Sequence, residues 1–338
     1  MRLNINNIGI IKEADIALNG LTVIAGKNDS GKSTVSKVLY SMITTLEQVE
    51  YKLENLSHIE YSQYQSKFNK SIQDIFNNQI SEDVNISFEY KDETIKVKLQ
   101  RDRCTQFEIP NSYKLNDIAT LGEFKVLMIE TPYIWNIFPT LKSINNLSNT
   151  QIDFNIPTIT SDLYFALNTK LKDSGREIAL DIDSIIEGEF QDDDFGNFIF
   201  QKDDKRVELT NTAMGIKYFG ILQVLANNNH FYKEQILILD EPEVHLHPTW
   251  QLELAKQIVH LVKNGVKILV NSHSPYMIEA LELFAKKEKI LSNFYFAKKE
   301  KDSAIITNVD NNLEVIYETL SDTFMELERI ALRDNFKW

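Results

Sequence analysis

The sequence has a single cysteine and few basic residues for its length. One cysteine, Cys104, excludes an internal disulfide and fits a reducing compartment. The 36 lysine and arginine residues are outnumbered by 49 aspartate and glutamate residues, which gives a formal net charge of −13. This balance excludes a broad basic surface, so a nucleic acid would have to be bound by a local basic patch or by a partner chain.

Long apolar runs are also missing. No stretch reaches the roughly 18 apolar residues that a membrane-spanning helix needs, and the first residues, MRLNINNIGI, lack the pattern of a signal peptide. No segment repeats at a fixed period, which excludes a solenoid. The 338 residues are 43% hydrophobic and 25% charged, as in ordinary globular proteins. We therefore expect a cytoplasmic protein with no membrane partner.

The clearest motif, GKNDSGKST, follows the apolar run LTVIA. It matches the pattern G-x-x-x-x-G-K-[ST] at every fixed position. LTVIA predicts a buried strand, and apolar residues at helical spacing after the motif predict a helix. In this context the backbone N–H groups of the loop and of the helix start converge on phosphate oxygens. The expected nucleotide-binding residues are Gly26, Lys27, Asn28, Asp29, Ser30, Gly31, Lys32, Ser33 and Thr34.

Further candidate residues follow two later apolar runs. We expect Lys32 to reach the β- and γ-phosphates and the Ser33 hydroxyl to bind Mg²⁺. The segment ILILDEPE places Asp240 and Glu241 at the end of a buried strand, where ligands bind in open α/β sheets. Asp240 is expected to hold Mg²⁺, and Glu241 to orient and deprotonate the attacking water. The segment LVNSHSP would bring His273 beside the γ-phosphate if its strand is a neighbour.

Strand and helix patterns alternate in the last third of the chain. This alternation predicts an α/β fold with a mostly parallel sheet covered on both faces. In the middle, NISFEY and TIKVKLQ alternate with period two and predict an antiparallel hairpin. Further helices are expected at about 162–172, 178–187 and 324–332. We expect an ATP-binding core made from residues 1–50 and 198–338, with an inserted lobe of helices and β-hairpins at 51–197.

The order of GKNDSGKST, TAMGIK, ILILDEPEVHLHP and VNSHSP resembles the ABC-type ATPase heads of the SMC, RecF and OLD kind. Most similar are small bacterial ATPases of anti-phage defence systems. The resemblance covers residues 1–41 and 210–280 well, and the insertion only in outline. It implies a P-loop NTPase that binds ATP and Mg²⁺ and forms a homodimer with two ATP molecules between the subunits. In such dimers a signature segment of one subunit faces the ATP of the other, which implies contacts from Thr212 and Gly215.

The sequence departs from this family at Met214, where a serine usually donates a hydroxyl to the γ-phosphate. A thioether cannot donate a hydrogen bond. Either Thr212 and the backbone compensate, or ATP-driven closure is weak and turnover is slow. The start of the helix at Gly215 favours a phosphate in both cases, because its N–H groups and dipole attract an anion.

The resemblance favours an ATP-hydrolysing switch in bacterial defence or DNA surveillance. A nuclease or toxin on another chain is the expected effector, because the segment after His273 is too short for the nuclease domain of full-length OLD-like proteins. Three alternatives stay open. They are a DNA-repair ATPase of RecF or SMC character that acts directly on DNA, a transporter ATPase subunit, and a nucleotide-dependent scaffold with little turnover.

Two weaker patterns have alternative interpretations. His245 and His247 could share a metal ion, although no cysteine or further histidine cluster lies nearby to complete four ligands. Lysine-rich runs at 286–289 and 298–301 flank the aromatic stretch SNFYF. They are either a nucleic-acid contact or the solvated ends of a core strand.

Overall fold

The computed structural model describes residues 1–48, 58–76, 80, 83–90, 93–101, 103–109, 125–146, 156–172, 177–193, 197–320 and 329–330. The strands are β1 (Arg2–Ile8), β2 (Ile11–Ala17), β3 (Leu21–Ala25), β4 (Asp83–Tyr90), β5 (Glu93–Gln100), β6 (Arg103–Glu108), β7 (Val126–Ile129), β8 (Glu189–Asp192), β9 (Phe198–Lys202), β10 (Lys205–Glu208), β11 (Ile236–Asp240), β12 (Lys267–Ser272), β13 (Ser292–Glu300) and β14 (Ser303–Asn308). The helices are α1 (Lys32–Gln48), α2 (His58–Phe76), α4 (Ile134–Asn146), α5 (Thr158–Asn168), α6 (Asp183–Ile186), α7 (Met214–Asn227), α8 (Pro248–Lys263) and α9 (Pro275–Glu288), with a 3-10 turn at Leu209–Asn211.

One large mixed sheet organises the described residues. Its 11 strands have the order β6-β5-β4-β1-β2-β14-β13-β3-β12-β11-β7. The strands from β13 through β3, β12 and β11 to β7 are parallel. Every residue of β3 and of β11 is buried, as the continuous apolar runs predict for strands covered on both faces. The carboxyl ends of β3, β11 and β12 therefore lie together at one edge.

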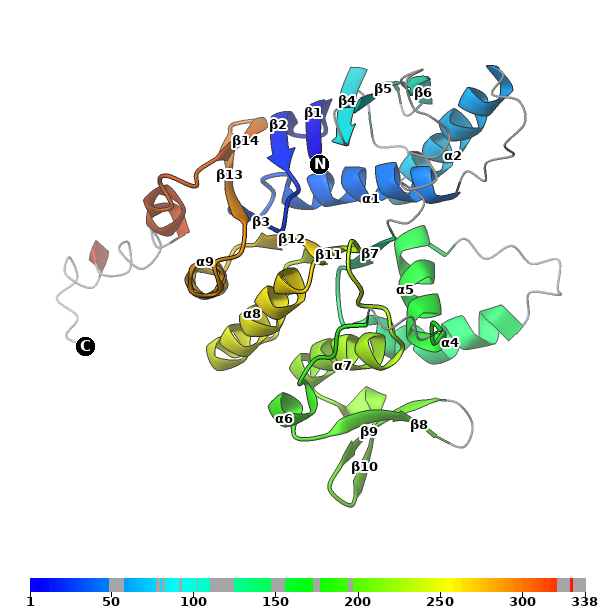
Figure 1. The fold of residues 1–338 in the computed structure, drawn as a ribbon, viewed down its shortest axis with the longest axis vertical. Helices are drawn as coiled ribbons and strands as arrows, with labels where there is room; N and C mark the ends of the chain where they lie inside the picture. Colours follow the sequence, from blue (N-terminus) through cyan, green and yellow to red (C-terminus); the bar gives the residue numbers. More distant parts are fainter. Residues whose placement is uncertain are drawn as a thin grey trace.

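Two apolar cores cover the two faces of this sheet. Along β3, Val23 packs in the core built with α7, α8 and α9, while Ile24 packs in the core built with α1 and α2. Successive side chains of a strand point to opposite faces, which explains this division. Figure 1 shows α1 and α2 on one side of the sheet and α7, α8 and α9 on the other. The predicted α/β fold with helices on both faces is confirmed.

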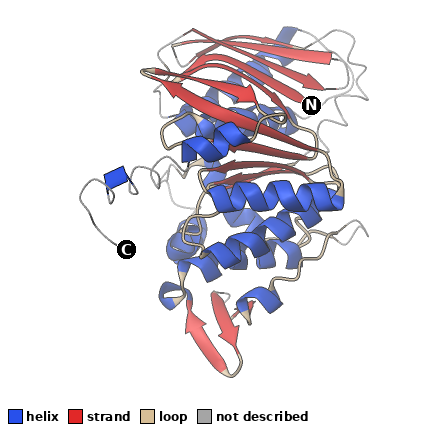
Figure 2. Ribbon diagram, turned by 90° about the vertical axis from the view of Figure 1, so that its left-hand side faces the viewer, coloured by secondary structure: helices blue, strands red, loops and turns tan. Residues whose placement is uncertain are grey.

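The antiparallel part comes mostly from the middle of the chain. Strands β4 and β5 form the predicted hairpin, and β4 pairs with β1. Strand β7, also within 51–197, pairs with β11. The segment expected to be an inserted lobe thus extends the central sheet at both of its edges, while the boundaries at 50 and 198 stay predictions. Strands β9 and β10 form a second hairpin, which joins β8 in a small sheet that lies apart from the large one (Figure 2).

Some expected helices have different bounds. The helix expected at 162–172 is α5, which starts at Thr158 because Pro157 fixes a helix-compatible φ before it. The helix expected at 178–187 is only the single turn α6, since Glu187 adopts a left-handed conformation with φ of 51°. The helix expected at 324–332 lies outside the described residues except for 329–330. None of the helices that the structure describes has the length and apolar character needed to cross a membrane.

Candidate functional site

The phosphate-loop motif lies between β3 and α1. Gly31 has a φ of 87°, and a Cβ there would lie 2.6 Å from a side-chain carbon of Ile11, so only glycine fits. Lys32 opens α1 with only 3% of its surface exposed. Its Nζ donates to the carbonyls of Gly26 at 2.9 Å and Lys27 at 3.0 Å. The loop therefore curls around a buried ammonium group, as a phosphate cradle requires.

The other loop residues divide into an exposed tip and a buried base. Lys27, Asn28 and Asp29 are exposed, and Asp29 forms an ion pair with Lys299 of β13. Ser30 is buried, and its Oγ has no hydrogen-bond partner. A buried donor without a partner fits a loop that completes its hydrogen bonds with a phosphate ligand.

Asp240 is held in place by the neighbouring strand. It ends β11 beside Asn271 of β12, which is its partner in the parallel register. The Asn271 amide donates to Asp240 Oδ1 at 2.6 Å and to Ser36 Oγ at 2.8 Å. Since all three side chains are buried, this amide fixes the carboxylate against the first turns of α1. Asn271 is a polar residue in an otherwise mostly apolar strand, and this pattern could have identified it. It was not among the residues predicted from the sequence.

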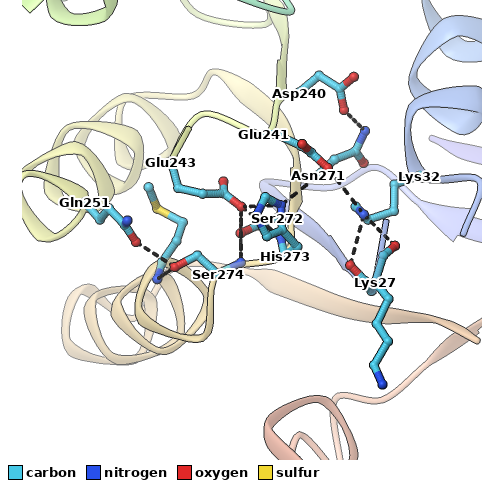
Figure 3. A network of polar contacts seen from close by, with 12 residues as sticks. Lys27, Lys32, Asp240, Glu241, Glu243, Gln251, Asn271, Ser272, His273 and Ser274 are labelled. Atoms are coloured by element: carbon cyan, nitrogen blue, oxygen red, sulfur yellow. Dashed lines mark hydrogen bonds and ion pairs between the residues drawn. The ribbon is translucent and has the colours of Figure 1, made fainter. Parts of the chain in front are cut away.

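Glu241 lies between two other predicted residues. Its Oε1 is 3.5 Å from Lys32 Nζ and 3.4 Å from His273 Nδ1. Figure 3 shows Asp240, Glu241 and His273 on the side that faces Lys32. The Glu241 backbone has a φ of 49°, and its N–H donates to the carbonyl of Asn271 at 2.9 Å. The structure thus gathers the four predicted residues from three separate segments.

A cavity of about 260 Å³ opens beside this group. Ser33, Glu130, Asp240 and Glu241 line it, and all four offer oxygen atoms, which Mg²⁺ prefers. No group of three or more His, Cys, Asp or Glu side chains within the described ranges is arranged to hold a metal ion. In nucleotide sites Mg²⁺ binds through one or two protein groups, water and substrate phosphates, and Ser33 and Asp240 would be those groups here.

Two residues of this cavity were missed in the sequence. Glu130 follows β7 directly, as Asp240 ends β11, so the same pattern of a buried strand and an acid could have identified it. Burial raises the pKa of Glu130, while Lys37, at 3.6 Å, lowers it and Asp240 raises it further. Tyr218 of α7 is fully buried, which raises its pKa, as do the charges of Glu243 and Asp240.

Glu243 is a third missed residue. Its Oε1 accepts from the Ser272 hydroxyl at 2.8 Å and from the backbone N–H groups of His273 at 2.8 Å and Ser274 at 3.1 Å. The side chain is buried, and its Oε2 has no hydrogen-bond partner. Ser274 also donates to Gln251 at 2.6 Å. Glu243 therefore holds the turn that carries His273, and Figure 3 shows these contacts.

The signature segment lies at the start of α7. The Thr212 hydroxyl donates to the carbonyl of Glu208 at 3.0 Å, so its proton is already engaged. Gly215 is buried, and a Cβ there would lie 3.0 Å from the ring of Trp250. Ala213 is the N-cap residue and provides no side-chain hydrogen bond to the helix. Both explanations for Met214 stay open, but with the Thr212 hydroxyl engaged, compensation would rest on the backbone N–H groups.

The paired histidines have separate surroundings. The ring of His247 accepts the N–H of Thr249 at 3.3 Å and caps the start of α8. His245 has a positive φ of 69°, and its carbonyl packs close to Gly215. A helix cap explains why a hydrogen-bonding side chain stands at 247.

The comparisons with known proteins agree with this geometry. Residues 136–278 match the model of a family described as an AAA ATPase domain. The Septu protein PtuA of Bacillus thuringiensis is 36% identical over 47 residues, which are 14% of this chain and 12% of PtuA. The matched part is therefore far less than two thirds of that relative's length.

Solved structures of SMC heads share the fold. An SMC head bound to the C-terminal winged-helix domain of ScpA aligns with a TM-score of 0.53 and 13% identity, over 93% of this chain and 98% of that one. The SMC head domain of Thermotoga maritima aligns with a TM-score of 0.47 and 14% identity, over 91% of this chain and 98% of that one. Residues 136–278 are thus similar to an AAA ATPase domain and the chain has the fold of an SMC head, which agrees with the resemblance found in the sequence.

Proposed function

We propose that this ATPase of SMC-like fold is an ATP-hydrolysing switch that dimerises head to head around ATP and serves a bacterial defence system through a separate effector chain. The observation that carries the proposal is the position of Glu241, whose carboxylate lies between Lys32 and His273 at the rim of the oxygen-lined cavity. A general base needs this access to solvent and to the phosphate, and 31% of the Glu241 side chain is exposed.

Each residue of the site has a distinct part in this reaction. Lys32 and the loop N–H groups bind the β- and γ-phosphates, while Ser33 and Asp240 hold Mg²⁺, which neutralises phosphate charge when bound. Without nucleotide, Lys32 Nζ lies 3.5 Å from Glu241 Oε1. When Lys32 binds the γ-phosphate instead, the Glu241 carboxylate is free to accept a hydrogen bond from the attacking water. Glu241 accepts the proton of that water, and His273 donates a hydrogen bond to the γ-phosphate.

Replacing the proposed base tests the switch. Glu241→Gln keeps the size of the side chain but removes its basicity, so ATP hydrolysis should fall by roughly 100-fold or more. ATP binding should persist, and ATP-bound dimers should accumulate because hydrolysis no longer separates them. Steady-state phosphate release and light scattering after size exclusion measure the two effects. Glu279→Gln, an exposed residue of α9, is the matched control. Equal hydrolysis by the wild type and Glu241→Gln would contradict the switch.

The defence setting rests on the short likeness to a Septu defence protein. The rival role in DNA repair needs a basic surface, and several lysines of the two candidate runs are already paired. Lys286 pairs with Glu282, Lys298 with Glu300, and Lys299 with Asp29. We therefore expect weak DNA binding by the chain alone. Metal-dependent DNA cleavage by the purified chain would contradict a separate effector, whereas tight binding that weakens with salt would favour the repair ATPase.

A further inference from the structure

A second cavity, of about 320 Å³, lies away from the nucleotide site. It is enclosed by the last turns of α1, by α5, by the start of β7 and by the segment between α7 and β11. The lining residues that decide its chemistry are Glu47, Lys125, Asp162, Phe165, His230 and Gln235. Its volume is at the small end of the range for ligand sites, which begins near 300 Å³.

The cavity and the nucleotide site share the same elements. Helix α1 starts at Lys32 and carries Glu47 in its last turn, and Gln235 and Asp240 flank the apolar residues of β11. Strand β7 begins beside the cavity and ends before Glu130, which lines the nucleotide site. A ligand in the second cavity would therefore contact the far ends of the elements that hold ATP.

The walls of this cavity carry two carboxylates without a cationic partner. Glu47 accepts the backbone N–H of Val126 at 2.7 Å, and Asp162 accepts the hydroxyl of Tyr40. Each of these bonds uses one carboxylate oxygen. Within the part of the chain that the structure describes, neither carboxylate forms an ion pair with lysine, arginine or histidine. Lys125 also lines the cavity and lowers the pKa of Glu47, so one positive charge faces two partly buried carboxylates, and acceptor oxygens remain for a further cation.

Gln235 supplies an independent observation. It is 2% exposed, it lines the cavity, and its Oε1 accepts no hydrogen bond. A buried carbonyl oxygen without a donor indicates that a ligand with N–H or O–H groups completes the site. His230 does not provide that donor, because its Nε2 lies 2.7 Å from the carbonyl of Thr169. Phe165, which is 51% exposed, adds an aromatic face at the cavity.

We propose that this cavity binds a small organic cation, an alkylammonium or guanidinium group, whose N–H donors meet Glu47, Asp162 and Gln235. A ligand with several N–H donors and a positive charge complements the oxygen acceptors of these three side chains. The ring of Phe165 is attracted to the same kind of cation. Anionic ligands are repelled by the two carboxylates.

The charge state of the cavity adds a second readout. Burial raises the pKa of Glu47 to about 8, and burial also raises the pKa of Asp162. The other titratable groups around the carboxylates are Tyr40, Lys125, His230 and Tyr232. Burial lowers the pKa of His230, so this ring stays neutral above pH 7. A cation favours the ionised carboxylates, and its binding should therefore tighten as the pH rises from about 6.5 to 8.5.

Calorimetric titration of the full chain tests the proposal. The probes are acetyl-arginine-amide, which represents the side chain of a partner protein, and putrescine, which represents a free amine. Acetyl-citrulline-amide is the neutral isostere. We expect saturable binding of at least one cation, and its binding should weaken about tenfold or more in Glu47→Gln and in Asp162→Asn. Glu279→Gln, the exposed control, should bind as the wild type does. The probe that binds more tightly identifies the source of the cation.

Both substitutions keep an oxygen that can accept the existing bond from Val126 or Tyr40, so both variants are expected to fold. Urea unfolding checks this, and the half-exposed Phe165→Leu provides a third variant that should also weaken cation binding. The proposal is overturned if neither cation binds, if acetyl-citrulline-amide binds as well as the arginine derivative, or if the folded variants bind cations as tightly as the wild type.

Discussion

Neighbouring carboxylates of this molecule have different surroundings, and these set what each can do. Asp240 is fixed by an amide, Glu241 faces a lysine and solvent, and Glu243 is buried against three donors. All three lie within four consecutive residues, yet only Glu241 combines exposure with contact to the phosphate loop. These contacts support the proposed division of roles, with Asp240 as metal ligand, Glu241 as base and Glu243 as positioning residue.

Glu243 should matter for stability as well as for hydrolysis. Glu243→Ala leaves the Ser272 hydroxyl and two backbone N–H groups without their acceptor, so we expect a loss of about 1–3 kcal/mol. Urea unfolding measures this loss, with Glu279→Ala as the exposed control on α9. Glu243→Gln keeps one acceptor oxygen and should lower kcat more than it changes KM for ATP. An alanine variant as stable as the wild type would show that the turn does not depend on Glu243.

Glu47 should make the protein less stable at high pH. Its pKa rises from 4.5 to about 8 on burial, so the folded state favours the protonated form. Stability from this group is therefore present at low pH and is lost as the pH rises through about 5 to 8. Glu47→Gln removes this dependence. We expect the variant to be more stable than the wild type near pH 8.5 and similar to it near pH 5, by urea unfolding. The opposite order at the two pH values would contradict a raised pKa.

At the scale of helices and strands, prediction succeeded where local pattern and burial agree. LTVIA and ILILD are mostly apolar and form the buried strands β3 and β11. Because parallel neighbours end at the same edge, the acids and histidine after them could be placed together from the sequence. Helix α4 was missed since Pro139 lies inside it, and burial of Trp135 and Phe138 compensates for the lost hydrogen bond.

Other parts of the site had no local signal. Glu243 is one acid among several in DEPE, and only the three-dimensional turn at 272–274 reveals why it is buried. The hydroxyl of Thr212 is bonded to Glu208 within its own loop, which the family resemblance does not indicate. The second cavity also escaped prediction, because its lining residues come from four elements with no common spacing in the sequence.

Helix α7 provides a test of packing between elements. Gly220 lies in this helix where a Cβ would overlap the ring of Phe190 on β8. Alanine normally favours a helix over glycine by about 1 kcal/mol. Here we expect Gly220→Ala to destabilise the protein by about 1–3 kcal/mol, because the aromatic ring must shift. Adding Phe190→Leu should recover part of the loss in a double-mutant cycle measured by urea unfolding. A single alanine variant more stable than the wild type would contradict this packing.

At the scale of the whole molecule, the proposed dimer depends on the signature segment. Helix α7 begins without a side-chain cap, so its first N–H groups are available to the phosphate of a partner's ATP. Met214→Ser adds a hydroxyl donor at this helix start. We expect stronger ATP-dependent dimerisation or faster hydrolysis, measured by light scattering and phosphate release with Met214→Leu as the control. If neither quantity changes, the methionine does not limit closure of the dimer.

The position of β3 in the sheet has a consequence for synthesis of the chain. This strand is made early, but its two neighbours, β12 and β13, come from residues 267–300. While the ribosome makes the intervening segments, this mostly apolar strand has neither of its native hydrogen-bonding partners. Contacts so distant along the chain make folding slow and leave nascent chains prone to aggregation. Chaperone capacity during translation should therefore influence how much of this protein reaches its native state.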